Sequence, residues 1–410
     1  MRERYQPQIK SYEIHPISIK QIQKGHPWVT MDKFSEKFHP KERFIIASNR
    51  KKPFALLIHD PTHKDVRARV WATSGDFNRQ TKNFKNDLGN RIQTAMKKRL
   101  DAGILKERNN FYLIFGEADH IPGVFVQWLN GEVLIQFYMN FWNFYKDYIV
   151  QQLIKVINDK VDPDFYIENC WLQSRSLTKD PALSMDPNCS FRSVEITEFG
   201  VKYKVLLGKH YDHGIYTDMS SVRSRLKEEL TNSKSVLNLY SYTGAFSLYA
   251  LSLGVEDVVS VDLSSKYIDW LEENIKLNKD FNPDHHKSMV TDTDSALKQL
   301  KKEKKKFDFI ISDPPSSSTD KNKRTNSLND YKMNLPLIDN LLTPAGSTLV
   351  FLNTHKVSMK KFEERILQII EEKKLKLKVA KKFYLSEDCP TKKGFHEGNY
   401  LKGILLKKDD

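Results

Sequence analysis

The chain has few cysteines and no long apolar segment. Its three cysteines, Cys170, Cys189 and Cys389, lie far apart and form no C-x-x-C pair, which argues against a disulfide framework and a zinc site. No metal is expected. No apolar run approaches the ~20 residues that a membrane-spanning helix needs, and the first ten residues lack the apolar core of a secretory signal. These absences favour a cytoplasmic protein with reduced thiols.

Glycine is scarce where a dinucleotide cofactor would need it. The loop after the apolar segment 236–240 holds one glycine, Gly244. A G-x-G-x-x-G run, which lets the backbone approach a pyrophosphate closely, is missing. A nicotinamide cofactor is therefore the weaker interpretation of this loop.

Acidic residues are outnumbered, and the formal net charge of the 410-residue chain is +14. This surplus favours a polyanionic partner such as nucleic acid. The alternative is an ordinary lysine-rich surface, because the run 298–306 alone supplies several of the charges and such runs are usually solvated helix ends. The length predicts two or three domains.

Three segments differ in pattern. Residues 1–73 contain short β-rich runs separated by turns, which predicts a small, mostly β barrel. Residues 74–200 combine helical periodicity with strand pairs and predict an α+β domain. Residues 201–410 alternate strand and helix, as a doubly wound α/β domain does. We therefore expect an α/β protein with two smaller domains before its Rossmann-like part.

One strand of the first segment carries basic side chains. In 66–71, alternation places Val66 and Ala68 on one face and Arg67 and Arg69 on the other, beside Lys64. These three cations are candidate contacts to RNA phosphates. Ordinary solvent-facing charge is an equally good explanation for either arginine alone.

Ligand-facing residues follow three predicted strands of the last segment. Ligands of open α/β sheets bind at the carboxyl ends of strands, and an acidic residue ending the second strand, here Asp262, is placed to bind ribose hydroxyls. Asp292 and Asp294 end the third strand, where an adenine edge would lie, and we prefer Asp294. In the first loop, backbone amides and a helix N-terminus can hold a carboxylate. That loop contains the candidates Asn238, Tyr240, Ser241, Thr243 and Gly244. This order of strands and loops describes an S-adenosylmethionine (SAM) site.

The fourth predicted strand ends in Asp313-Pro-Pro315. Two prolines fix a rigid loop that can present Asp313 to a base beside the methyl donor. We expect Asp313, Pro314 and Pro315 to belong to the catalytic site, with Asp313 also touching the cofactor.

Motifs spread over nearly the whole chain carry a family resemblance. They are Gly25-His-Pro-Trp-Val29, Arg67-Ala-Arg-Val70, Gly116-Glu-Ala-Asp-His-Ile-Pro-Gly123, Gly214-Ile-Tyr-Thr-Asp218, Asn238-Leu-Tyr-Ser-Tyr-Thr-Gly-Ala-Phe246, Asp262, Asp313-Pro-Pro315 and Glu397-Gly-Asn-Tyr-Leu-Lys-Gly403. In this order they resemble the bacterial large-subunit ribosomal RNA methyltransferases with a PUA domain, a middle α+β domain and a Rossmann-like methyltransferase domain.

The resemblance implies SAM-dependent methylation of one base of 23S rRNA, free or in a large-subunit assembly intermediate, by a protein that contacts no membrane. It also implies that Tyr216 and Asp218 contact the cofactor. A homodimer is an alternative to a monomer. Amino-group methyltransferases usually have an aromatic residue after the two prolines, whereas this chain has Ser316, which disfavours exocyclic amines.

The missing cysteine bears on the methylated atom. Methylation of cytosine C5 needs a thiolate that adds to C6, and in the cytosine-specific relatives this cysteine follows the fifth strand. Here that segment is Phe351-Leu-Asn-Thr-His-Lys356, which resembles the Asn-and-Lys segment of guanine-N7 relatives. Guanine N7 needs positioning and charge stabilisation, which Asn353 with Asp313 could supply. We favour guanine N7, and the alternative is cytosine C5 with Cys389 as a displaced nucleophile. His355 could be a general base, but methylation at N7 removes no proton, so we expect a structural or RNA-facing role for it.

At one place the sequence differs from the family pattern in a segment that is expected to contact the cofactor. Relatives continue the Gly214–Asp218 motif with Gln-Arg, whereas this chain has Met219-Ser220, although Arg223 follows. A polar contact to SAM is thereby missing, which keeps a non-catalytic RNA-binding protein as an alternative. A small-molecule methyltransferase is a separate alternative.

Overall fold

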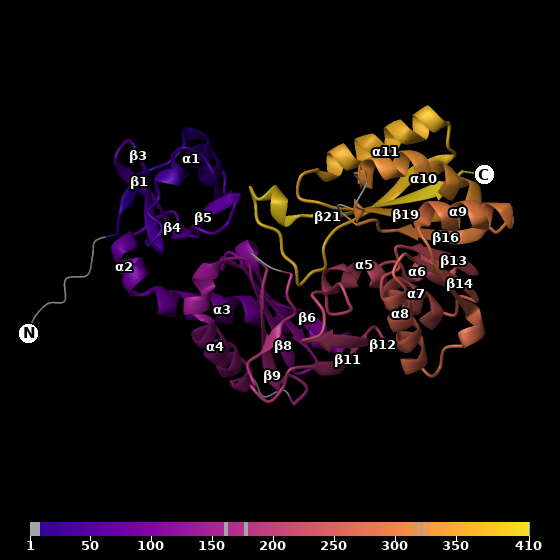
Figure 1. Cartoon of the computed structure of the whole chain (residues 1–410), viewed down its shortest axis with the longest axis horizontal. Coiled ribbons are helices and arrows are strands. Elements are labelled where there is room, and N and C mark those ends of the chain that lie inside the picture. Colours follow the sequence, from indigo (N-terminus) through magenta and orange to yellow (C-terminus); the bar gives the residue numbers. More distant parts are fainter. Residues whose placement is uncertain are drawn as a thin grey trace, which may run out of the picture. The chain divides into compact units, whose positions relative to one another are not determined.

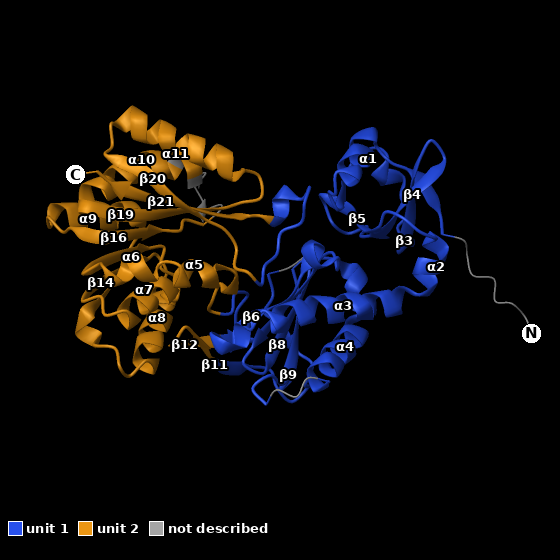
Figure 2. Cartoon of the chain, turned by 180° about the vertical axis from the view of Figure 1, so that it is seen from behind, with its two compact units in different colours: residues 1–194, 206–213, 388–398 blue, residues 195–205, 214–387, 399–410 orange. Residues whose placement is uncertain are grey.

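The computed structural model describes residues 9–159, 163–175, 179–315, 318–320, 323–325 and 327–409. The chain divides into two compact units (Figure 2). Unit 1 comprises residues 1–194, 206–213 and 388–398, and unit 2 comprises 195–205, 214–387 and 399–410. The three-domain division expected at residues 73 and 200 stays a prediction. Within the described ranges, no helix is long and apolar enough to cross a membrane.

The N-terminal part of unit 1 is a five-stranded sheet in the order β1-β3-β4-β5-β2 (Figure 1). Its β3–β4 turn places Arg50 and Lys51 at φ of 51° and 65°, as a two-residue hairpin turn requires. The elements are β1 (Ser11–Glu13), α1 (Pro16–Gln23), β2 (Trp28–Thr30), β3 (Phe44–Asn49), β4 (Lys52–His59) and β5 (Val66–Ala72). The expected β-rich region is present, and its identification as a PUA domain stays a prediction.

The second part of unit 1 has a sheet in the order β10-β9-β8-β7-β6 with α3 and α4 beside it (Figure 1). Ile46 and Leu56 of the first sheet join its core, whereas their neighbours Ile45 and Leu57 face a separate core of the first sheet. The elements are α2 (Phe77–Lys82), α3 (Phe84–Asp101), β6 (Asn110–Phe115), β7 (Val124–Leu129), β8 (Glu132–Phe137), α4 (Lys146–Asn158), β9 (Asn169–Ser174) and β10 (Leu183–Ser184). The two parts of unit 1 thus share apolar packing.

A two-stranded sheet, β11 (Arg192–Glu198) and β12 (Val201–Leu207), precedes the large sheet of unit 2. The large sheet has the order β15-β14-β13-β16-β19-β21-β20. Its first five strands are parallel, and β21 runs antiparallel to β19 and β20. The strands are β13 (Ser235–Leu239), β14 (Asp257–Asp262), β15 (His286–Val290), β16 (Phe307–Ser312), β19 (Leu342–Asn353), β20 (Leu377–Phe383) and β21 (Leu401–Lys408).

Helices cover both faces of this sheet, with α7 and α8 on one side and α10 and α11 on the other (Figure 1). The central strands are mainly apolar, as in Phe309-Ile-Ile311, because parallel strands in such a layered fold are buried on both faces. The remaining elements are α5 (Ser220–Ser224), α6 (Lys227–Thr231), α7 (Ala245–Ser252), α8 (Ser265–Leu277), α9 (Thr293–Lys302), β17 (Ser318–Asp320), β18 (Lys323–Thr325), α10 (Ser327–Leu341) and α11 (Met359–Lys373). The expected α/β class with a Rossmann-like part is confirmed.

The strand order reverses between β13 and β16. From β13 the chain moves outward to β14 and β15, and it then crosses back to add β16 on the other side of β13. Such a switch point opens a crevice at the carboxyl ends of the strands, where ligands of open α/β sheets bind.

Candidate functional site

A cavity of about 920 Å³ lies in unit 2 at the carboxyl ends of β13, β14 and β16. This volume is within the range of small-molecule sites. Twelve of the candidate site residues line it, namely Tyr216, Asp218, Asn238, Tyr240, Ser241, Asp262, Asp292, Asp294, Asp313, Pro314, Pro315 and Asn353. Segments far apart in the sequence therefore meet at one place.

The loop after β13 is tightly wound. Tyr240, Tyr242 and Gly244 have φ of 58°, 51° and 85°, and a Cβ added at Gly244 would lie 2.5 Å from Leu271. Glycine is therefore required at position 244, because a side chain there would clash with the packed helix α8.

Thr243 does not line the cavity, but it fastens the loop. Its hydroxyl donates to the carbonyl of Gly214 at 2.5 Å, and the hydroxyl of Tyr242 accepts from the Gly214 amide at 3.0 Å. These bonds attach the start of the 214–218 segment to the loop. Thr243 and Gly244 thus shape the cavity from behind.

Asp262 lies at the end of β14 and receives two backbone amides. Tyr242 N donates to its Oδ2 and Ser264 N to its Oδ1, each at 2.9 Å. Burial raises the pKa of Asp262, and the amide hydrogen bonds oppose this rise. A carboxylate can accept about four hydrogen bonds, so Asp262 retains capacity for a further donor such as a ribose hydroxyl.

The two acidic candidates after β15 both line the cavity. Asp292 caps helix α9, since its Oδ1 accepts from Ser295 N at 2.9 Å. Hydrogen bonds from the hydroxyl and then the amide of Ser295 lower the pKa of Asp292. Asp294 forms an ion pair with Lys298 at 2.5 Å and is partly exposed. Asp294 as the adenine contact stays a prediction.

Two carboxylates face the part of the cavity at the end of β16. Asn353 Nδ2 donates to Asp313 Oδ1 at 2.7 Å, and the hydroxyl of Tyr400 donates to Asp218 Oδ2. Burial, followed by the nearby charge of Asp218, raises the pKa of Asp313 to about 7, against a lowering by the Asn353 hydrogen bond. Asp313 therefore titrates near neutral pH, as groups in functional sites often do.

The cavity offers features that fit a SAM molecule. The hydroxyl of Ser241 lines it and is buried, and no described group forms a hydrogen bond to this oxygen. Buried hydroxyls are normally paired, so this one is available to a bound polar group such as the carboxylate of an amino acid moiety. Asp262 as the contact to the ribose stays a prediction.

Sequence reasoning missed some lining residues. Tyr400 contacts Asp218, and its position within the Glu397–Gly403 motif was the available signal. Asp330 and Met333 of α10 also line the cavity, but nothing in the sequence pattern around them indicated a site. Ser316 and Ser317 lie outside the described residues.

Met219 and Ser220 stand where relatives have Gln-Arg, and the structure shows what surrounds Met219 and the nearby Arg223. Met219 is buried and lines the cavity. Arg223 is also buried, pairs with Glu198 through Nε at 2.6 Å and donates to the carbonyl of Tyr216 at 3.2 Å. Arg223 thus supports the backbone of the segment that carries Tyr216 and Asp218.

The three RNA candidates, Lys64 before β5 and Arg67 and Arg69 within it, do not form one exposed surface. Lys64 is exposed, and Arg67 donates to the carbonyl of Pro61 at 2.6 Å. Arg69 is only 3% exposed and pairs with Glu117 at 3.2 Å. The solvent exposure expected for Arg69 from alternation along β5 is wrong, because Glu117 lies against its guanidinium group and supplies a buried counter-charge. An RNA contact by Lys64, Arg67 or Arg69 stays a prediction.

No cysteine lines the cavity in the described part of the chain. Cys389 is 2% exposed and lies in the 388–398 segment of unit 1, and the residues of unit 2 include no cysteine in the sequence. His355 is exposed beyond the end of β19.

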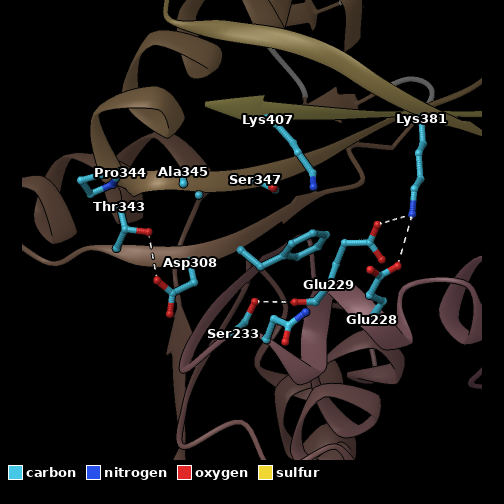
Figure 3. A pocket seen from close by; sticks show the side chains of 13 residues that line it. Glu228, Glu229, Ser233, Asp308, Thr343, Pro344, Ala345, Ser347, Lys381 and Lys407 are labelled. Atoms are coloured by element: carbon cyan, nitrogen blue, oxygen red, sulfur yellow. Dashed lines mark hydrogen bonds and ion pairs between the residues drawn. The ribbon is translucent and has the colours of Figure 1, made fainter. Parts of the chain in front are cut away.

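A second cavity, of about 500 Å³, lies at the amino ends of β16 and β19 (Figure 3). Its charged side chains largely satisfy one another, since Lys381 pairs with Glu229 at 2.7 Å and Thr343 donates to Asp308 at 2.9 Å. Because ligands of such sheets bind at the opposite end of the strands, the first cavity is the candidate site.

Comparison with known proteins agrees with this geometry. Residues 169–366 match the model of an S-adenosylmethionine-dependent methyltransferase family. Over 302 residues the chain is 31% identical to the Bacillus subtilis protein named "Putative ribosomal RNA large subunit methyltransferase YwbD", covering 73% of this chain and 74% of that one. It is 26% identical over 402 residues to "Ribosomal RNA large subunit methyltransferase I" of Aliivibrio fischeri, covering 95% and 96%.

A solved structure shares the fold over nearly the whole chain. The structure titled "Crystal structure of SMU.776, a putative methyltransferase complexed with SAH" superposes with a TM-score of 0.81 at 21% identity, covering 98% of this chain and 100% of that one.

Proposed function

Because the chain belongs to the family of S-adenosylmethionine-dependent ribosomal RNA large subunit methyltransferases, we propose that it methylates a base of 23S rRNA at guanine N7. We choose N7 because of the residues at the acceptor side of the cavity, which is the part next to the end of β16 where the base would bind. It presents Asp313, held by Asn353, close to Asp218, and its lining contains no thiol among the described residues.

SAM, when bound, supplies an electrophilic methyl group on its sulfonium sulfur. The chain's part is to bind and orient it. We assign the ribose to Asp262 and the methionine carboxylate to Ser241 and the amides of the loop after β13, beside Tyr240 and Asn238. Tyr216 and Asp218 close the same cavity from the 214–218 segment, and Asp294 is assigned to the adenine edge.

Guanine N7 attacks the methyl carbon with its own lone pair. The N–C bond forms as the S–C bond breaks, and the base is left with a positive charge and no proton to lose. Ionised Asp313, with Asp218 nearby, stabilises that charge, because preoriented groups in a water-poor site act strongly on developing charge. Pro314 and Pro315 keep the Asp313 backbone rigid.

Cytosine C5 is the competing acceptor, and it requires a cysteine thiolate at C6. Burial of Cys389 within unit 1 and the absence of cysteine from unit 2 disfavour it. A net charge of +14 suits an RNA substrate, either free or within a cytoplasmic assembly intermediate of the large subunit.

The test is nucleoside mass spectrometry of 23S rRNA from a strain that lacks the gene, with and without the restored gene. We expect the loss of one 7-methylguanosine, its return with the wild-type gene and no return with Asp262→Ala. Loss of 5-methylcytidine instead would overturn the assignment to N7, and an unchanged nucleoside profile would overturn the rRNA substrate.

A further inference from the structure

A lysine is buried behind the acceptor side of the cavity without an acidic partner. Lys402 of β21 is 2% exposed, and among the described residues no carboxylate lies within ion-pair distance of its ammonium group. Burial lowers the pKa of Lys402 to about 8. Burying a charge without a partner of opposite charge costs free energy. The hydrogen bonds of the Lys402 ammonium group must therefore offset this cost.

Those contacts join two chain segments that end at the cavity. The Lys402 ammonium group donates to the carbonyl of Thr354 and, at 2.9 Å, to the carbonyl of Tyr400. The Thr354 amide donates to the same Tyr400 carbonyl at 3.0 Å. Lys402 therefore ties the residue after the end of β19 to the residue before the start of β21.

The side chains next to these tied carbonyls reach both carboxylates of the site. Asn353 precedes Thr354 and donates to Asp313, and Tyr400 donates to Asp218. Both side chains line the cavity, whereas Lys402 does not. One ammonium group behind the site thus fixes the backbone of the two residues that orient Asp313 and Asp218.

We propose that Lys402 is a positioning residue for methyl transfer, which holds Asn353 and Tyr400, and through them Asp313 and Asp218, in the geometry that receives the acceptor base. This inference rests on the proposed function. The donor side of the cavity, with Asp262 and Ser241, is attached to the loops after β13 and β14 and does not depend on Lys402.

The test uses the full-length Lys402→Met variant, which places an apolar side chain of similar length in the buried site and should keep the fold. We expect kcat for methylation of 23S rRNA to fall roughly 10- to 100-fold, since displacement of a reacting group by about 1 Å has effects of this size. The KM for SAM should change by less than about twofold, because ribose recognition is unaffected. Lys407→Met, at an exposed position of the same strand, is the matched control and should keep the wild-type kcat.

An unchanged kcat, or an equal loss in binding of SAM, would overturn the role of Lys402. A second measurement is independent of the substrate. In crystals with S-adenosylhomocysteine, the hydrogen bond between Asn353 Nδ2 and Asp313 Oδ1, 2.7 Å in the wild type, should be broken or lengthened in Lys402→Met. If it is retained, the proposal is wrong. If the wild-type protein fails to methylate rRNA, only the proposed function falls, and the crystal comparison still decides the role of Lys402.

Discussion

The amide of Asn353 donates to the carboxyl of Asp313 across 2.7 Å, and so links the end of β19 to the end of β16 at the mouth of the switch-point crevice. Two neighbouring parallel strands thereby present one polar pair to the cavity. The other amide atom, Asn353 Oδ1, is buried without a hydrogen-bond partner in the described residues. This oxygen is available to a donor on the acceptor base, such as an amino or imino group of guanine.

Replacing Asn353 should therefore affect transfer more than binding of the methyl donor. We expect Asn353→Ala to lower kcat by roughly 10²-fold, the effect of removing one preoriented polar group from a catalytic site. Binding of S-adenosylhomocysteine, measured by calorimetry, should stay close to the wild-type value because the residues that we propose for the ribose and the amino acid moiety, Asp262 and Ser241, belong to other loops of the cavity. A loss of affinity as large as the loss of rate would contradict this division of roles.

The pKa of Asp313, raised to about 7, predicts a pH dependence. Below this pH the carboxyl is protonated and neutral, and above it the carboxylate stabilises the positive charge that methyl transfer leaves on the base. The value of kcat/KM for SAM, which reports groups of the free enzyme, should rise as the pH increases through about 7 and then level off. Steady-state rates between pH 5.5 and 9 would measure this rise.

Asp313→Asn is the control for that profile. The donor's own α-amino group titrates at about 7.7–8.0 in its free form, and this titration is present in both proteins. The difference between the wild-type and variant profiles therefore isolates Asp313. Two superimposable profiles, scaled only by a constant factor, would mean that Asp313 does not titrate in this range.

Asp262 should control affinity for the donor. Its two oxygens already accept the amides of Tyr242 and Ser264, so the side chain is fixed before any ribose arrives. We expect Asp262→Ala to weaken SAM binding about 10- to 100-fold, since hydrogen bonds to charged groups contribute about 1.5–3 kcal/mol. Isothermal titration calorimetry would measure the loss, with Asp269→Ala on the neighbouring helix α8 as a variant outside the cavity. Equal affinities in the Asp262 and Asp269 variants would exclude Asp262 from the ribose site.

The site residues that directly follow a predicted strand could be identified from the sequence. The ends of parallel strands meet at one edge of a sheet, so Asp262 and Asp313 could be placed together from their positions after apolar runs. Tyr400 and Lys402 could not be placed in this way. They reach the site because β21 inserts antiparallel between β19 and β20, which pairs Asn353 with Leu401, and local patterns do not encode such a long-range register.

Charge at the surface was predicted less well than the core. Period-two alternation assigned Arg69 to solvent. Its guanidinium group is buried instead, because Glu117, 48 residues away in the sequence, offsets the free-energy cost of burying the charge. The same reasoning from local sequence left the position of Cys389 open. Its burial follows from the neighbouring Asp388, whose partners are also distant in sequence.

Asp388 should anchor the 388–398 segment within unit 1. Its Oδ1 accepts from Arg108 Nη2 at 2.8 Å, its Oδ2 accepts from Tyr112 N at 2.7 Å, and both charged side chains are fully buried. Removing one partner leaves an uncompensated buried charge, which costs about 3–5 kcal/mol. We expect Asp388→Ala to lower the free energy of unfolding by an amount of this order, measured by urea titration. Glu364→Ala, which removes an exposed pair with Lys360, should change it by less than about 1 kcal/mol.

The Asp388→Ala variant also tests whether burial keeps the thiol of Cys389 from reacting. In the wild type, burial of Cys389 should make its alkylation by iodoacetamide slow, because only an accessible thiolate reacts. Once Asp388 is replaced and the segment loses its anchor, the alkylation rate of Cys389, followed by peptide mass spectrometry, should rise. Partly exposed Cys189 provides an internal reference whose rate should not change. Rapid alkylation of Cys389 in the wild type, together with loss of methyl transfer on modification, would instead return this thiol to consideration as the nucleophile of a cytosine C5 reaction.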